Sequence, residues 1–171
     1  MFNYGLKKEK KDKSNKLIND KEAYIPVNYS WRILMDSKNK LIALIRIRGT
    51  VGVRKDIAET LKRLNLPHVN NLSLVRADLA TLGMINKCKD YITYGEISEE
   101  TLAKILKKQN KEEGAVKELI EGSRNIKEAL EIPVRLHPPR HGYEGVKRPY
   151  GHGGSIGYRG NAINELINRM L

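Results

Sequence analysis

Arginines directly follow an apolar run near residue 45. Leu41–Ile45 are all apolar, and Arg46, Ile47 and Arg48 then alternate in polarity before Gly49. Alternate residues of a strand face opposite sides, so we expect Ile47 to stay in the core while both arginines share the other face. Guanidinium groups suit phosphate, and a glycine lets the partner approach the backbone. The pattern therefore predicts a site for a phosphate-rich partner; a half-exposed strand end with solvated arginines is the alternative.

A second stretch whose residue types could bind a partner spans residues 138–160. It holds seven of the fourteen glycines and has no hydrophobic periodicity. Its cationic and aromatic side chains are Arg140, His141, Tyr143, Lys147, Arg148, Tyr150, His152, Tyr158 and Arg159. Arginine and lysine pair with phosphates and tyrosine rings stack on bases, which predicts a nucleic-acid-binding loop. Simple disorder is the competing interpretation, because Gly-rich polar segments bury little apolar surface.

Signals for catalysis or metal binding are weak. His137 and His141 are four residues apart, but the prolines between them prevent a helix, and Cys88 is the only cysteine. We therefore expect no metal site and no internal disulfide. The glycines at 154, 157 and 160 lack the Gly-Lys-Ser/Thr and acidic partners of nucleotide-binding loops. No nucleophile and base have a spacing that demands catalysis, so we expect neither an enzyme nor a cofactor.

Charge indicates the kind of partner. The 171 residues have a net charge of +12 and are 40% hydrophobic, which predicts one soluble domain with extensions and a polyanionic partner, nucleic acid or an anionic membrane surface. No apolar run approaches the ~18 residues of a membrane span, and no apolar leader is present, so we expect a cytoplasmic protein. Residues 1–40 carry net +5, residues 41–132 net +3 and residues 133–171 net +4. Both ends of the chain are therefore basic.

The elements that would position these residues follow from periodicity. Strands are predicted near 41–48, 70–75 and 91–97, with helices at 54–65 and after an N-cap at Asp78. This β-α-β-α-β order predicts a small mixed sheet backed by two helices.

Later segments add helices and an edge strand. Ser98 is predicted to cap a helix, and residues 113–121 and 125–131 have helical spacing; together they suggest an insert or a lid over the sheet. Residues 132–137 predict an edge strand because of Pro133. Asn161 is predicted to cap a final amphipathic helix, which would tether the basic loop at both ends.

Several motifs occur in a recognisable order. They are residues 44–49 (LIRIRG), Thr60-Leu61-x-x-Leu64-x-Leu66, residues 83–87 (GMINK), residues 135–140 (RLHPPR), Lys147-Arg148 and residues 157–160 (GYRG). Together they resemble the large-subunit ribosomal protein family numbered thirty, in its archaeal branch, whose eukaryotic counterpart is numbered seven. The resemblance covers about residues 39–171, and the preceding extension departs from it. Met35 is an alternative start.

The resemblance implies an α+β fold with a ferredoxin-like β-α-β-α-β core, a three-stranded antiparallel sheet and two helices on one face. The expected organisation is a basic N-terminal extension over 1–38, partly disordered off the ribosome, then the core over 39–97 and a helical insert over 98–132. Residues 133–171 are expected to form a strand, the basic Gly-rich loop and a terminal helix, with the loop ordered by RNA.

By the same resemblance, the protein would be a structural constituent of the large ribosomal subunit. Its partners would be large-subunit rRNA of the 23S type, neighbouring ribosomal proteins and, by position, 5S rRNA. The predicted RNA-binding residues are Arg46, Arg48, Gly49, Arg54, Lys55, Arg76, Asn86, Lys87, Arg135, His137, Arg140, His141, Lys147, Arg148, Tyr150, Tyr158 and Arg159. A ribosome assembly or regulatory RNA-binding factor is the alternative function, and a small enzyme on the same fold is a more distant one.

Overall fold

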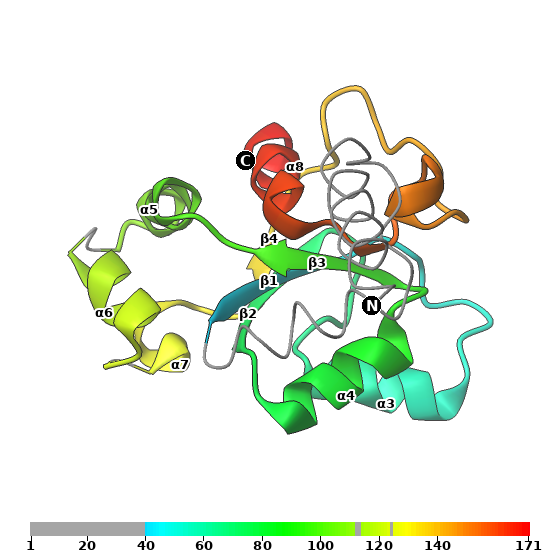
Figure 1. The fold of residues 1–171 in the computed structure, drawn as a ribbon, viewed down its shortest axis with the longest axis horizontal. Helices are drawn as coiled ribbons and strands as arrows, with labels where there is room; N and C mark the ends of the chain where they lie inside the picture. The colour runs from blue at the N-terminus through cyan, green and yellow to red at the C-terminus, as the bar shows by residue number, and fades with distance from the viewer. Residues whose placement is uncertain (1–39, 112–113, 124) are drawn as a thin grey trace, which may run out of the picture.

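A computed structural model describes residues 40–111, 114–123 and 125–171 (Figure 1). The expectations for the N-terminal extension over 1–38 lie outside the described residues. Within the described ranges, no helix is long and apolar enough to cross a membrane.

A five-stranded sheet forms the centre of the fold. Its strands are β1 (Leu41–Arg46), β2 (Asn71–Arg76), β3 (Ile92–Glu96), β4 (Val134–Arg135) and β5 (Gly157–Tyr158), in the spatial order β4-β2-β1-β3-β5. β1 pairs antiparallel with both β2 and β3, which confirms the predicted antiparallel centre. The sheet is larger than three strands, because β4 joins β2 antiparallel and β5 joins β3 in parallel. These edge strands are two residues long each, and β4 lies within the edge strand predicted over residues 132–137.

Helices cover both faces of this sheet. They are α3 (Lys55–Arg63), α4 (Leu79–Cys88), α5 (Glu99–Lys108), α6 (Ala115–Glu121), α7 (Ile126–Ala129) and α8 (Ile163–Met170). In Figure 1, α3 and α4 lie below the sheet, whereas α5 and α8 lie above it. The helices predicted as an insert or lid are therefore part of a second layer that the sheet requires.

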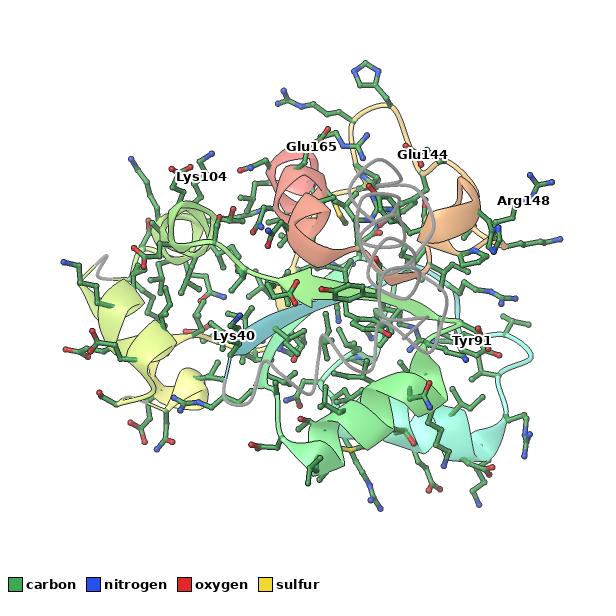
Figure 2. All side chains as sticks on the ribbon, viewed as in Figure 1. Lys40, Tyr91, Lys104, Glu144, Arg148 and Glu165 are labelled. Carbon is green, nitrogen blue, oxygen red and sulfur yellow. The ribbon has the colours of Figure 1, made fainter. Side chains whose placement is uncertain are left out.

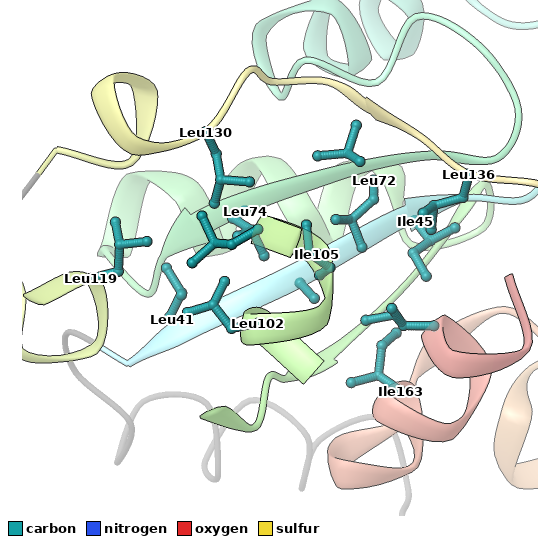
Figure 3. Packing of buried hydrophobic residues seen from close by; sticks show 14 of the residues in the cluster. Leu41, Ile45, Leu72, Leu74, Leu102, Ile105, Leu119, Leu130, Leu136 and Ile163 are labelled. Atoms are coloured by element: carbon teal, nitrogen blue, oxygen red, sulfur yellow. The ribbon is translucent and has the colours of Figure 1, made fainter. Parts of the chain in front are cut away.

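Strand β1 explains why two layers are needed. All six of its residues are buried, and the continuous apolar run over Leu41–Ile45 predicts this for the first five. Ile42 and Leu44 pack in a cluster with residues of α3 and α4. Leu41, Ala43 and Ile45 belong to a second cluster, which residues of α5 to α8 complete (Figure 3). One strand thus contributes alternate side chains to two separate cores.

The helix starts agree with the sequence at two of three positions. The Ser98 hydroxyl accepts a hydrogen bond from the Thr101 amide at the start of α5, and the Asp78 amide donates to Thr81 Oγ1 at the start of α4. The prediction for Asn161 is wrong. A short 3₁₀ turn, η2 (Gly160–Ala162), precedes α8, and Asn161 lies inside it.

The Gly-rich segment over 138–160 crosses the end of the molecule from β4 to β5. Its backbone donates from His137 to the Met170 carbonyl (3.0 Å) and from Arg140 to the Arg169 carbonyl (3.1 Å), which ties it to the end of α8. Further along, the Ser155 amide donates to the Gly145 carbonyl (2.9 Å) around the 3₁₀ turn η1 (Tyr150–His152). Backbone hydrogen bonds therefore connect the segment both to α8 and within itself.

One glycine of β3 permits the second layer to approach. A Cβ at Gly95 would collide with the backbone of Gly160 in η2. Because η2 leads directly into α8, this close approach determines where α8 can lie on the sheet.

We expect Gly95→Ala to reduce the free energy of unfolding by about 1–3 kcal/mol, because the added methyl group must displace backbone rather than a mobile side chain. Urea unfolding measures this. Gly83→Ala in α4 is the matched control, since nothing lies within 4 Å of a Cβ at Gly83. It should stabilise the protein by about 0.5–1 kcal/mol through helix propensity. Equal effects of the two substitutions would contradict the packing argument.

Candidate nucleic-acid interface

Several basic segments meet at one end of the sheet, where β1 stops and β2 and β3 begin. The register pairs Arg46 with Ile92 at the start of β3, and Asn71 at the start of β2 with Arg135. The loop after β1, the end of α4 and the chain leaving β4 therefore converge here. Arg148 lies at this end too, on the same side of the molecule as Tyr91 (Figure 2).

Arg48 is held in place by the loop that precedes β3. Its guanidinium carbon lies 5.1 Å from the centroid of the Tyr91 ring, and its Nη1 donates to the Asp90 carbonyl (3.3 Å). The amides of Ile47 and Arg48 both donate to the Tyr91 carbonyl. Arg48 is half-buried, so part of the guanidinium faces solvent in a restricted orientation. Next to it Gly49 is exposed, with open space where a Cβ would lie.

The starts and ends of α3 and α4 add further polar side chains. Arg54 forms an ion pair with Asp56 at 3.3 Å, but their side chains are 79% and 55% exposed, so the pair is weak and open to competition. Lys55 and Lys87 are exposed, and neither has a hydrogen-bond acceptor among the described residues. Asn86, one residue before Lys87, is half-buried.

The chain leaving β4 presents its polar face as predicted. Val134 and Leu136 are buried, whereas Arg135 and His137 are exposed, which confirms the alternation. Arg140 and His141 continue along the exposed surface.

The turn around η1 supplies the remaining exposed cations. Lys147 and Arg148 are exposed, and neither has an acceptor within the part of the chain that the structure describes. Tyr150 is 37% exposed, and its ring lies 4.4 Å from the Arg159 guanidinium carbon. That stacking fixes the ring where a base could reach its exposed side.

Arg46 does not leave the core, contrary to the prediction from alternation. It is 3% exposed, and burial lowers the pKa of its guanidinium. Its Nη1 donates to the carbonyls of Leu66 (2.8 Å) and Pro67 (2.7 Å), while Nε and Nη2 donate to the Arg48 and Gly49 carbonyls. The guanidinium thus joins the loop after β1 to the segment after α3, and it has little capacity left for phosphate.

Three other predicted residues also have partners inside the protein. Tyr158 donates to the Glu96 carboxylate at 2.8 Å and 3.0 Å, and burial followed by that hydrogen bond raises the pKa of its phenol. Arg159 is 8% exposed, and burial lowers its pKa. Arg76 lies at the opposite end of β2, with its guanidinium against the backbone of Gly122. These three residues stabilise the fold and do not extend the exposed surface.

The other thirteen of the seventeen predicted residues lie exposed or half-buried on the segments that enter or leave the sheet where β1 stops. We call this surface the basic end. It consists of Arg48, Gly49, Arg54, Lys55, Asn86, Lys87, Arg135, His137, Arg140, His141, Lys147, Arg148 and Tyr150. Together the fold and this surface define a small α+β protein with an exposed cationic surface of the kind that binds polyanions.

Comparison with known proteins agrees with this class. The family model described as ribosomal protein L30p/L7e matches residues 42–92, which span β1 to the first residue of β3. The large ribosomal subunit protein uL30 of Methanococcus vannielii is 41% identical over 151 residues, covering 75% of this chain and 98% of the relative. The uL30 protein of Nanoarchaeum equitans is 44% identical over 153 residues, covering 77% and 99%. That of Thermoplasma volcanium is 39% identical, covering 77% and 93%. The chain belongs to the L30p/L7e family, that is, to the uL30 family.

One contributor to the basic end escaped sequence reasoning. Tyr91 supports Arg48, yet the two residues are 43 positions apart, and the sequence around Tyr91 indicates only a strand. The pairing of β1 with β3 brings them together, and no local pattern reports that contact.

The assignment of Arg46 leads to a test by substitution. Arg46→Ala should reduce the free energy of unfolding by about 2–3 kcal/mol, because it leaves buried carbonyls without a donor. Arg46→Lys keeps the charge but cannot reach four carbonyls, so it should also destabilise the fold. Urea unfolding measures both, alongside the salt dependence of RNA binding.

Arg48→Ala is the control and should behave in the opposite way. It should leave stability nearly unchanged and reduce the slope of log K against log salt by about 1. If Arg46→Lys lowered RNA affinity without loss of stability, Arg46 would be a phosphate ligand after all.

Proposed function

We propose that this protein is a non-catalytic structural constituent of the large ribosomal subunit, acting in the cytoplasm. It binds large-subunit rRNA of the 23S type through the basic end, helps to anchor 5S rRNA, and contacts neighbouring ribosomal proteins. Membership of the uL30 family supports the ribosomal assignment.

The observation that carries the RNA assignment is that three cations of the basic end, all on the segment after β4, have no carboxylate partner. Arg140, Lys147 and Arg148 are exposed, and none of them forms an ion pair or side-chain hydrogen bond among the described residues. Three uncompensated cations on one segment repel each other, and that repulsion is relieved when phosphates bind. Displacement of counterions from the RNA adds a favourable entropy.

Recognition of this kind depends on shape more than on base sequence. Arg48 is oriented by Tyr91 before any partner arrives, so little side-chain entropy is lost when it meets a phosphate. Gly49 leaves open space beside it, where an RNA backbone can come close to the loop. The exposed part of the Tyr150 ring offers a surface for an unpaired base.

Titratable groups with shifted pKa values do not suggest a catalytic role. Burial raises the pKa of the Cys88 thiol to about 11 and that of the Tyr143 phenol to about 12. At neutral pH both groups are protonated, so neither is an activated nucleophile. The Tyr143 hydroxyl donates a hydrogen bond to Asn70 Oδ1 at 2.7 Å, so we assign this side chain a structural role.

A triple substitution tests the basic end. Replacing Arg140, Lys147 and Arg148 with Ala should weaken binding of an rRNA fragment and reduce the slope of log K against log salt by about 2–3 units. Binding at several salt concentrations gives the slope. The matched control replaces Lys104, Lys107 and Lys108 of α5, which are equally exposed and away from the basic end. The control should keep the wild-type slope. An unchanged slope in the first variant would remove this segment from the interface.

Occupancy on the ribosome tests the function as a whole. Large subunits isolated on a sucrose gradient and washed with high salt should retain about one copy of this protein, measured against a known core ribosomal protein. Loss on washing, or presence only in immature particles, would instead identify an assembly or regulatory factor. Absence from ribosomal fractions would contradict both assignments.

A further inference from the structure

A groove lies between α5 and α8, outside the basic end. Its volume is about 400 Å³, and it is lined by Lys104, Lys107 and Lys108 of α5 together with Asn168 and Leu171 of the C-terminal segment. No aspartate or glutamate lines it.

The three lysines present their ammonium groups at the rim of this groove. At spacings of three and four residues they lie on one side of the helix. Lys104 Nζ donates to Asn168 Oδ1 at 3.0 Å, and Lys108 Nζ donates to the main-chain oxygen of Leu171 at 3.5 Å. The Asn168 acceptor is a neutral amide, and Lys107 has no acceptor among the described residues. Lys104 is thus held in place across the groove without a charged partner, and the charge of Lys107 is uncompensated.

Helix electrostatics account for only part of this arrangement. Lys107 and Lys108 occupy the last turn of α5, where a positive charge is favourable beside the helix C-terminus. Lys104 lies one turn earlier, and it reaches across to α8 rather than to the end of its own helix. A stabilising role at the helix end therefore leaves Lys104 and the groove itself unexplained.

The floor of the groove is hydrocarbon. Leu171 is half-buried and packs against the core cluster that α5 and α8 share, with part of its side chain at the surface. Lysine stems add methylene groups beside it. An RNA backbone offers phosphates to the rim but no alkyl group to the floor. A peptide segment with an apolar residue between carboxylates satisfies both parts.

Negative charge lies between this groove and the turn that carries Arg148. In Figure 2, Glu165 and Glu144 lie between Lys104 on one side and Arg148 on the other. Both glutamates are exposed, and both act electrostatically on the same buried guanidinium, that of Arg159. A phosphate chain that continued from Arg148 towards Lys104 would pass these carboxylates and be repelled.

We propose that the groove between α5 and α8 is a docking site for an acidic segment of a neighbouring protein. Carboxylates of that segment pair with Lys104, Lys107 and Lys108, and an apolar side chain covers Leu171. The inference rests on the proposed function, because the partner is sought among the proteins that neighbour this one in the large ribosomal subunit.

Zero-length cross-linking tests this in intact large subunits. A carbodiimide joins a lysine amine to a carboxylate only where the two groups touch. We expect cross-links from Lys104, Lys107 or Lys108 to aspartate or glutamate of one protein, in a segment that also holds an apolar residue. Acetylation of these lysines should be slower in the subunit than in the free protein.

Two other results would overturn the proposal. Cross-links from these lysines to RNA alone, formed on ultraviolet irradiation, would assign the groove to rRNA. Acetylation at the same rate in the subunit and in the free protein would make the groove an open surface. If the protein is absent from subunits, the proposed function fails first, and the gradient experiment detects that separately.

A binding measurement with the cross-linked segment completes the test. A synthetic peptide of that segment should bind the free full-length protein, and replacing the three groove lysines with Ala should weaken binding about tenfold. The matched control replaces Arg140, Lys147 and Arg148, which removes the same charge from the basic end. Equal weakening by both variants would show a general charge effect and contradict a specific groove.

Discussion

Burial of β1 on both faces is the constraint on which the rest of the structure depends. Ile42 and Leu44 need one helical layer, and Ala43 and Ile45 need another, so neither layer alone can remove the strand from water. Helices α3 and α4 form the first layer, and α5 to α8 form the second. Because η2, which leads into α8, approaches β3 where Gly95 has no side chain, the fold of the C-terminal segment is tied to the central sheet.

Desolvation divides the arginines into two functional groups. Arg46 and Arg159 are buried. The guanidinium of Arg46 donates hydrogen bonds to four backbone carbonyls in place of water, and these bonds connect the loop after β1 to the segment after α3. Arg140 and Arg148 keep their hydration and have no partner in the described chain, so their charge is available. The buried group holds the loops in place, and the exposed group depends on those loops for its arrangement. The exposed arginines of this surface therefore depend on buried arginines that hold the loops in place.

Much of the fold was predictable where apolar residues repeat regularly. The three central strands, α3, α4, α5 and the final helix all follow from such periods. The parallel strand β5 was not predictable, since two residues carry no period, and neither was the 3₁₀ turn in place of a cap at Asn161. At the candidate site, the alternation around Arg135 was right, whereas the alternation at Arg46 placed a buried side chain outside.

The sequence by itself determined the family, the positive charge and the segments that carry it, because motif order and composition are properties of the chain alone. Only the tertiary structure decided which cations remain exposed. Arg46 and Arg48 have the same residue type and lie two positions apart, yet one meets carbonyls 20 and 21 residues away and the other meets the ring of Tyr91. Those contacts form when distant segments pack together, and burial by distant segments is what removes a charge from solvent.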